Sequence, residues 1–98
     1  MIFYEVRVTQ KADLDEQSVY KYISEKFGEI YAEKFRAKLI KTFQTLAKYP
    51  FIGRVAKNDK SLRVLIINKR NKLVYKIIES EIVIVRLMDM RTKSSGKY

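Results

Sequence analysis

The stretch from Leu62 to Arg91 constrains the fold more than any other part of the sequence. It contains three runs rich in Val, Ile, Leu and Tyr, and each run ends at polar residues typical of turns. The runs cover residues 62–67, 73–78 and 82–87. They predict three successive β-strands, joined by hairpin turns at 68–71 and at Glu79-Ser80.

Cations interrupt these apolar runs, and few acidic residues accompany them. The cations are Arg63, Lys69, Arg70, Lys72, Lys76, Arg86 and Arg91. The formal net charge of the chain is +10, and it is unevenly placed. Residues 1–50 hold nine Lys and Arg against seven Asp and Glu, whereas residues 51–98 hold twelve against four. This asymmetry suggests a polyanionic partner, and the alternative is that the lysines only keep the protein soluble.

The first half of the chain predicts one strand and two helices. Alternation of apolar and polar residues from Ile2 to Val8 indicates a strand with one face on a core. Asp13 followed by Glu16 resembles a capping box and predicts a first helix from about Leu14 to Phe27, closed by Gly28.

A second helix follows almost at once. Its apolar stripe has the spacing of a helix and consists of Ala32, Phe35, Leu39, Phe43 and Leu46. The helix should end at Tyr49-Pro50, because the residue before a proline is driven out of the α region. Residues 55–61 then read as a polar loop.

The element order is therefore β-α-α-β-β-β, and the fold class is α+β. A helical hairpin packed on one face of an antiparallel sheet would bury the single apolar face of every element. The first strand joins the sheet beside the last strand or at an edge, and periodicity does not decide between these. We expect one domain over residues 1–91 and a flexible basic C-terminal tail over 92–98.

Composition limits the chemistry. The sequence has no Cys and no His, so we expect no disulfide, no metal site and no cofactor, and catalysis would have to use Lys, Arg, Tyr, Asp or Glu. The chain shows no leader segment and no apolar run of roughly 20 residues, the length that spans a bilayer. These observations predict a cytoplasmic protein without a membrane partner.

Several segments, in this order and spacing, resemble the RelE/ParE superfamily of toxins from type II toxin–antitoxin systems. They are Ala12-Asp13-Leu14-Asp15, Tyr22-Ile23, Leu46-Ala47-Lys48-Tyr49-Pro50-Phe51-Ile52-Gly53-Arg54, Leu62-Arg63-Val64-Leu65, Leu73-Val74-Tyr75-Lys76-Ile77 and Ile82-Val83-Ile84-Val85-Arg86. The resemblance covers nearly the whole chain. It implies a growth-arresting toxin held in a hetero-oligomer by a cognate antitoxin, whose partly disordered segment folds on binding.

The resemblance implies two possible mechanisms. RelE-like members cut mRNA on the ribosome and rely largely on Lys and Arg, whereas ParE-like members poison DNA gyrase and cut nothing. For an mRNA endoribonuclease, our first hypothesis, the catalytic candidates are Arg63, Lys72 and Arg91, converging on a scissile phosphate. Further nucleic-acid-binding candidates are Lys57, Lys60, Lys69, Arg70 and Lys76.

Departures from the family pattern keep the alternatives open. No His lies near the C-terminus, and Met88-Asp89-Met90 stands where relatives often carry a more basic ending. Asp89 is expected to form an ion pair with Arg91. Gyrase poisoning needs no catalytic set, and a degenerate, non-toxic antitoxin- or RNA-binding module is a third reading. Under any of them, we expect an acidic and apolar antitoxin segment to cover residues 62–67 and the last strand.

Overall fold

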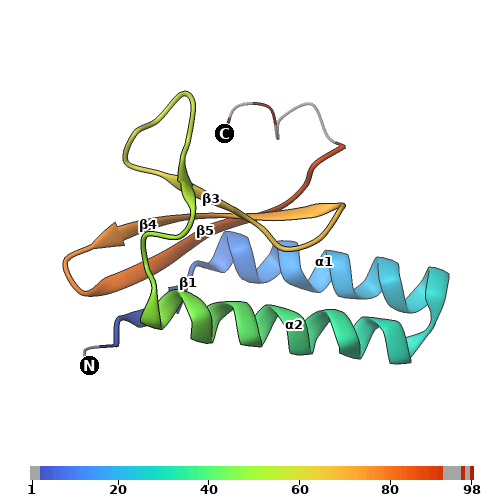
Figure 1. Ribbon diagram of the computed structural model, residues 1–98. Helices are drawn as coiled ribbons and strands as arrows, with labels where there is room; N and C mark the ends of the chain where they lie inside the picture. Colours follow the sequence, from blue (N-terminus) through green and yellow to red (C-terminus); the bar gives the residue numbers. More distant parts are fainter. Residues whose placement is uncertain (1–2, 92–95, 97) are drawn as a thin grey trace.

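The computed structural model describes residues 3–91, 96 and 98, and it confirms the α+β class (Figure 1). Two helices pack against one face of a five-stranded sheet. The elements are β1 (Glu5–Val8), α1 (Gln10–Phe27), α2 (Glu29–Lys48), β2 (Arg54–Val55), β3 (Arg63–Ile66), β4 (Asn71–Ile78) and β5 (Glu81–Asp89). β2 is an addition, because the sequence predicts a loop from residue 55 onward.

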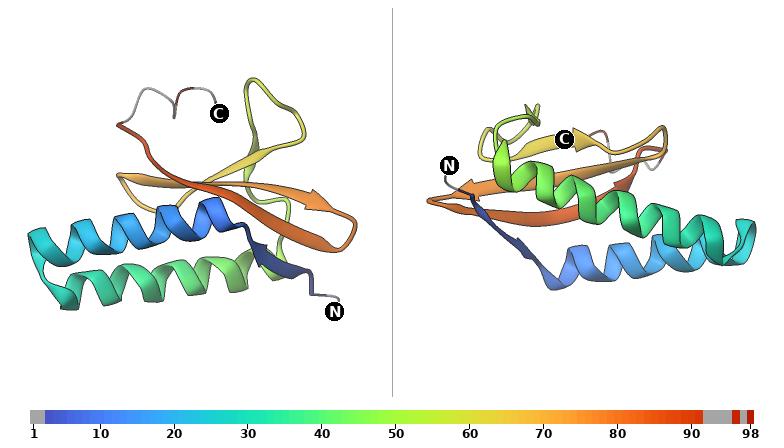
Figure 2. Two further views of the ribbon diagram at one scale, coloured as in Figure 1. Left: turned by 180° about the vertical axis from the view of Figure 1, so that it is seen from behind. Right: turned by 60° about the horizontal axis from the view of Figure 1, so that its bottom comes forward.

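The sheet is mixed and not wholly antiparallel, which corrects one part of the prediction. The strand order is β1-β5-β4-β3-β2, and β1 pairs in parallel with β5 while the other pairs are antiparallel. The first strand thus lies both beside the last strand and at an edge. Figure 2 shows from behind that β1 runs along β5 and leads directly into α1.

The start of α1 fixes the direction of β1. The Thr9 hydroxyl donates to the carbonyl of Ile84 at 2.8 Å, so the helix must begin beside the middle of β5. Beyond the end of β1, the Asp15 carboxylate accepts the Leu87 N–H at 3.1 Å and two hydrogen bonds from the Arg86 guanidinium. The α1 turn therefore continues the hydrogen bonding of the β5 edge where β1 stops.

The predicted capping box at Asp13 is wrong. Thr9 is the N-cap, and its side-chain oxygen accepts the Ala12 N–H, so α1 begins at Gln10 and not at Leu14. Asp13 lies within the helix and accepts a hydrogen bond from Gln17 instead. Gly28 ends α1 with φ +100°, a conformation that favours glycine, and α2 starts at the next residue.

The main core lies between the helices and the sheet. The side chains that point to the helices include Leu73 and Tyr75 of β4 and Ile82 and Ile84 of β5, all within 1% of complete burial. They pack against the α2 stripe that the sequence predicts, of which Phe35, Leu39 and Leu46 are buried. This arrangement leaves the opposite face of the sheet without a helix (Figure 1).

A smaller apolar cluster lies on that open face. It consists of Ala56, Val64, Val74 and Met88, with Leu62, Val85 and Tyr98 packed around it. The loop after β2 and residue 98 lie over this face of the sheet (Figure 1). Within the described ranges 3–91, 96 and 98, no helix is long and apolar enough to cross a membrane.

The predicted tail of 92–98 lies mostly outside the described residues. Tyr98 is described, and it is half-buried against the open-face cluster.

Candidate functional site

Arg63 faces the helix-covered side of the sheet. It stands opposite Tyr75 in the β3–β4 register, and directly opposed residues share a face. Its guanidinium donates to the carbonyl of Gly53 at 2.7 Å and to that of Phe51 at 3.2 Å, and it lies over the Phe51 ring. Arg63 thus has a structural use, since it holds the segment that follows α2.

Tyr75 binds the segment of residues 49–54 through its hydroxyl group. Its hydroxyl donates to the Pro50 carbonyl at 2.8 Å and accepts the Gly53 N–H at 2.9 Å. Burial raises the pKa of this phenol. A Cβ on Gly53 would lie 2.6 Å from the Tyr75 oxygen, so only glycine fits here without a shift. The segment 49–54 is therefore fixed by two side chains of the sheet.

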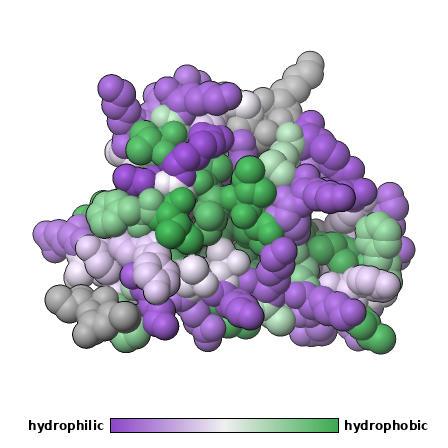
Figure 3. Space-filling view, in the orientation of Figure 1, coloured by the Kyte–Doolittle hydropathy of each residue, from purple (hydrophilic) through white to green (hydrophobic). Residues whose placement is uncertain are grey.

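The fixed segment presents apolar side chains to solvent. Tyr49, Phe51 and Ile52 are all about half exposed or more. Beside it, a groove between α2 and β3 is lined by Lys38, Lys41, Thr42, Thr45, Leu65, Ile66 and Ile67. Figure 3 shows hydrophobic side chains gathered above α2 on this side of the molecule, bordered by hydrophilic ones. Contiguous exposed apolar surface of this kind marks an interaction site.

Lys72 lies on the open face. It stands opposite Ile66 and Met88, and Met88 belongs to the open-face cluster. The residue is only 6% exposed, and burial together with nearby Arg54 and Lys57 lowers the pKa of the Lys72 amine. The pairing register therefore puts Arg63 and Lys72 on opposite faces of the sheet.

Arg54, Lys57 and Lys72 form what we call the open-face cation group. Arg54 is opposite Val64 in the β2–β3 register, so it shares the face of Lys72. The main-chain oxygen of Tyr98 accepts a hydrogen bond from the Arg54 guanidinium at 2.7 Å and one from the Lys57 N–H at 3.1 Å. Tyr98 thus places an oxygen beside the cations and a ring on the apolar cluster.

Three other nucleic-acid candidates, Lys60, Lys69 and Lys76, lie in three different places. Lys76 is on the open face of β4, close enough to Asp59 to lower the pKa of that carboxyl, although hydrogen bonds from Ser61 contribute more. Lys60 is exposed in the preceding loop, and Lys69 is exposed in the β3–β4 turn.

Arg91 lies at the end of β5, in what we call the strand-end cleft. This cleft of about 320 Å³ lies between α1 and the β3–β4 turn and is lined by Ser18, Val19, Tyr22, Arg70, Asn71, Asp89 and Arg91. Arg91 donates to both oxygens of Asp89, the shortest contact being 2.7 Å, which confirms the predicted ion pair. This pair lowers the pKa of Asp89 and raises that of Arg91.

The three catalytic candidates thus lie in three different surroundings. Arg63 is beneath the 49–54 segment, Lys72 is on the open face, and Arg91 is in the strand-end cleft. The structure brings Lys72 together with Lys57 and Arg91 together with Arg70. Their roles in catalysis stay predictions.

Arg54 and Tyr22 are not among the site residues that the sequence predicts. Arg54 is a cation directly after Gly53, and the β2 pairing that orients it has no signal in the sequence. Tyr22 stands in the sequence only as part of a segment that resembles the superfamily, whereas in the structure its side chain is 40% exposed and its hydroxyl accepts a hydrogen bond from Lys26 at 3.1 Å. Among residues 3–91, 96 and 98, no group of acidic side chains could hold a metal ion.

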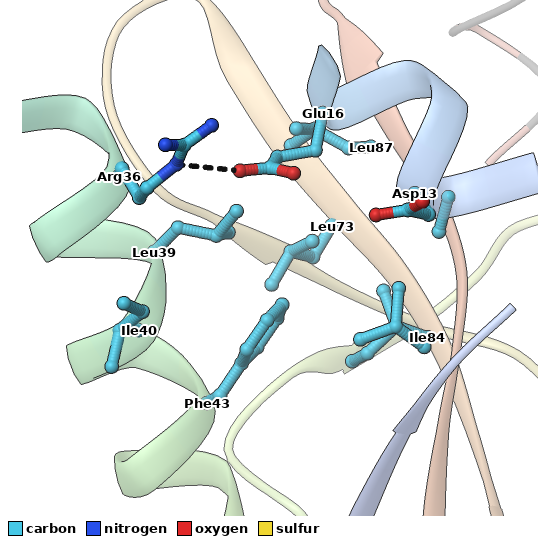
Figure 4. Close-up of a pocket in the computed structure, with 11 residues that line it drawn as sticks. Asp13, Glu16, Arg36, Leu39, Ile40, Phe43, Leu73, Ile84 and Leu87 are labelled. Atoms are coloured by element: carbon cyan, nitrogen blue, oxygen red, sulfur yellow. Dashed lines mark hydrogen bonds and ion pairs between the residues drawn. The ribbon is translucent and has the colours of Figure 1, made fainter. Parts of the chain in front are cut away.

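A cavity of about 220 Å³ opens between the two helices above the core (Figure 4). Leu73, Ile84 and Leu87 of the sheet form its floor, and Leu39, Ile40 and Phe43 line the side that α2 provides. At its rim the Arg36 guanidinium donates to Glu16 at 3.2 Å. Its lining is mostly apolar, so it suits a hydrophobic side chain and not an ionic substrate.

Comparison with known families identifies the chain. A family model described as ParE toxin of type II toxin-antitoxin system, parDE, matches residues 6–93. The chain belongs to this family of ParE toxins. The predicted RelE/ParE superfamily is therefore confirmed, and so is the broader prediction of a toxin from a type II toxin–antitoxin system.

Solved structures of similar fold agree with this membership. A chromosomal ParDE system from P. aeruginosa superposes on the toxin with a TM-score of 0.77 and 19% identity, over 89% of this chain and 96% of that one. The toxin–antitoxin complex RelBE2 from Mycobacterium tuberculosis gives a TM-score of 0.61 and 21% identity, over 90% and 99%.

A third structure, the YoeB dimer from Staphylococcus aureus, gives a TM-score of 0.61 and 16% identity, over 87% of the toxin and 94% of that chain. At such identities the likeness concerns the fold alone. No curated protein matches the toxin sequence.

Proposed function

We propose that this ParE-family toxin arrests growth by binding and poisoning DNA gyrase, without cutting nucleic acid itself. One observation carries the choice of mechanism: Arg63 and Lys72 face opposite sides of the sheet, so two of the three catalytic candidates do not share a site. Family membership supports the same choice. Both targets are cytoplasmic, and we place the toxin there.

Binding surfaces suited to a protein target support this proposal. The segment 49–54 presents Tyr49, Phe51 and Ile52 in fixed positions, so little conformational entropy is lost when they dock. Aromatic side chains and arginines dominate the binding energy of many interfaces. Arg54 is the last residue of this segment, and Arg63 binds the segment through the Gly53 carbonyl.

The test compares two targets with the same purified toxin. Added to gyrase and supercoiled plasmid, the toxin should trap double-strand breaks. Added to programmed ribosomes, it should leave mRNA intact. Site-specific mRNA cuts without gyrase-dependent breaks would overturn the proposal. Absence of growth arrest on induction in a bacterium without the antitoxin would instead favour a non-toxic binding module.

Ribosome-dependent mRNA cleavage remains the second candidate because of Lys72. Burial lowers the pKa of its amine, and Arg54 and Lys57 lie nearby, so the amine could transfer a proton beside a phosphate. A Lys72→Arg variant keeps the charge and cannot give up a proton at neutral pH. Loss of mRNA cutting in this variant, with ribosome binding retained, would support the second candidate.

We further propose that a cognate antitoxin covers the open face and the outer edge of β3 with an acidic, apolar segment. β2 pairs only with Arg63 and Val64, and Ile67 donates its N–H toward β4. Because backbone groups alternate in direction along a strand, the N–H and C=O of Ile66 point to the outer edge. An added strand could pair there, close to Lys38 and Lys41.

Salt dependence tests the electrostatic part of this proposal. Affinity for the antitoxin should fall as ionic strength rises, since the cations of the groove and the open face would be screened. Affinity that does not change with salt would show that charge plays no part in neutralisation.

A further inference from the structure

We propose that the strand-end cleft is a binding site for single-stranded nucleic acid, holding a backbone phosphate between Arg70 and Arg91 and a base against Tyr22. The site is separate from the open-face cation group, because it lies between α1 and the β3–β4 turn. It does not depend on which target the toxin poisons, since gyrase carries DNA and the ribosome carries mRNA.

Charge in the cleft favours an anion. Arg70 and Arg91 line it, and Lys26 reaches the Tyr22 hydroxyl from the next turn of α1. Among the described residues that line the cleft, Asp89 alone carries a carboxylate. One acidic group against three cations leaves an excess of positive charge, which a phosphodiester would reduce.

The cations are held in place before any ligand arrives. Asp89 binds the Arg91 guanidinium through Nε and Nη2 and also accepts the Arg91 N–H at 2.8 Å. The main chain at Arg70 is fixed on both sides, because its N–H donates to Asn68 at 2.7 Å and its carbonyl accepts from Met90 at 2.7 Å. Such order lowers the entropy lost on binding.

The polar groups in the cleft are donors suited to phosphate. The Arg91 guanidinium reaches both Asp89 and the Tyr22 hydroxyl, so a cation stands directly beside the aromatic ring of the cleft. The Ser18 hydroxyl also lines the cleft. Hydrogen bonds from Lys26 and Arg70 lower the pKa of the Tyr22 phenol, which agrees with positive charge concentrated at this oxygen.

An exposed aromatic ring distinguishes nucleic acid from a simple anion. Tyr22 is 40% exposed at the cleft, and Val19 extends the apolar surface beside it. Bases stack on exposed aromatic rings whatever their sequence, and phosphates bind the cations next to such rings. A duplex would use the cations alone, because its bases are already stacked.

The test measures binding of fluorescein-labelled single-stranded RNA, single-stranded DNA and a duplex of the same sequence over a range of salt concentrations. Arg70→Gln should weaken single-strand binding about fivefold and reduce the slope of log K against log salt by about 0.7. Tyr22→Leu should weaken single-strand binding about tenfold, leave the slope unchanged, and affect the duplex by less than about twofold.

Lys21→Gln is the matched control. Lys21 is on the same helix, its side chain is 78% exposed, and its nearest acidic partner is Glu25 at 4.0 Å. It should change affinity by less than about twofold. The proposal is overturned if Arg70→Gln behaves like Lys21→Gln, or if Tyr22→Leu binds single strands as the wild type does. Because oligonucleotide binding is read directly, a negative gyrase assay would not be confused with a negative result here.

Discussion

Polar and charged residues have different roles on the two faces of the sheet. On the helix-covered face, Tyr75 and Arg63 satisfy their hydrogen bonds within the protein and fix the segment after α2. On the open face, Lys72 is buried beside Arg54 and Lys57, and the pKa of its amine is lowered. Polar groups on the first face stabilise the segment after α2, whereas the second face concentrates cations around a buried amine.

A single strand carries both roles. Leu73, Tyr75 and Ile77 of β4 point to the helices, while Lys72 and Val74 point to the open face. Alternation at every second residue is what lets one strand build a core and present charge. Removing a polar group should therefore have different consequences on the two faces.

The largest effect is expected for Gly53→Ala. The new methyl group would lie 2.6 Å from the Tyr75 oxygen and 2.7 Å from its ring, and Tyr75 is fully buried. We expect the free energy of unfolding to fall by about 3 kcal/mol, the upper range of an overpacked core. Urea denaturation measures it, and a variant as stable as the wild type would show that the segment can move away from the ring.

Tyr75→Phe should have the next largest effect. It removes the hydroxyl and leaves the Gly53 N–H and the Pro50 carbonyl without this partner. The expected loss is about 2 kcal/mol in thermal or urea unfolding, the cost of unsatisfied buried groups. Tyr49→Phe serves as the control, because Tyr49 is 54% exposed, and it should change stability by less than about 0.5 kcal/mol.

On the open face, Lys72→Met should change how stability depends on pH. It removes an amine whose pKa is lowered by burial and by the nearby cations Arg54 and Lys57. Lys69→Met, in the exposed turn, is the control and should keep the pH dependence of the wild type.

The pH dependence that Lys72 gives the wild type has a defined direction. The folded-state pKa of Lys72 is lowered, so the native state releases this proton before the unfolded state does as pH rises. Wild-type stability then increases with pH through this interval, up to the ordinary lysine pKa, relative to that of the Met variant. Equal pH dependence in the two proteins would contradict this expectation. Urea titrations of both proteins at neutral and alkaline pH would measure the difference.

The smallest effect is expected at the end of β5, in the ion pair between Asp89 and Arg91. Asp89→Asn breaks the ion pair with the largely exposed Arg91, and we expect only a small loss of stability at pH 7. Because the pair lowers the pKa of Asp89, its stabilisation is present above the ordinary Asp pKa and is lost as pH falls through the lowered value. At sufficiently acid pH the two proteins should unfold at the same urea concentration.

Local patterns predicted the elements well because their causes are local. Apolar spacing places α2 and β4 close to their observed bounds, and Pro50 marks the end of α2. The parallel direction of β1 escaped prediction, because alternation reports which face is buried and not which way a neighbour runs. The choice of Thr9 over Asp13 as N-cap also depends on a distant contact, the carbonyl of Ile84.

The candidate sites were less predictable, since they depend on register. Alternation on β4 and a turn at 68–71 could already have put Arg63 with Tyr75 and Lys72 with Ile66. The strand-end cleft could not be inferred, because it joins Tyr22 of α1 to residues at the other end of the chain.

The position of β5 has a consequence for the order of folding. β5 pairs with both β1 and β4, so residues 81–84 must be present before the first strand has any neighbour in the sheet. Contacts between such distant parts of a chain form slowly. During synthesis β1 and the two helices leave the ribosome before β5, so β1 stays unpaired until β5 has emerged. The toxin can therefore reach its active shape only after nearly all of its chain has left the ribosome, which leaves an interval in which it is synthesised and still harmless.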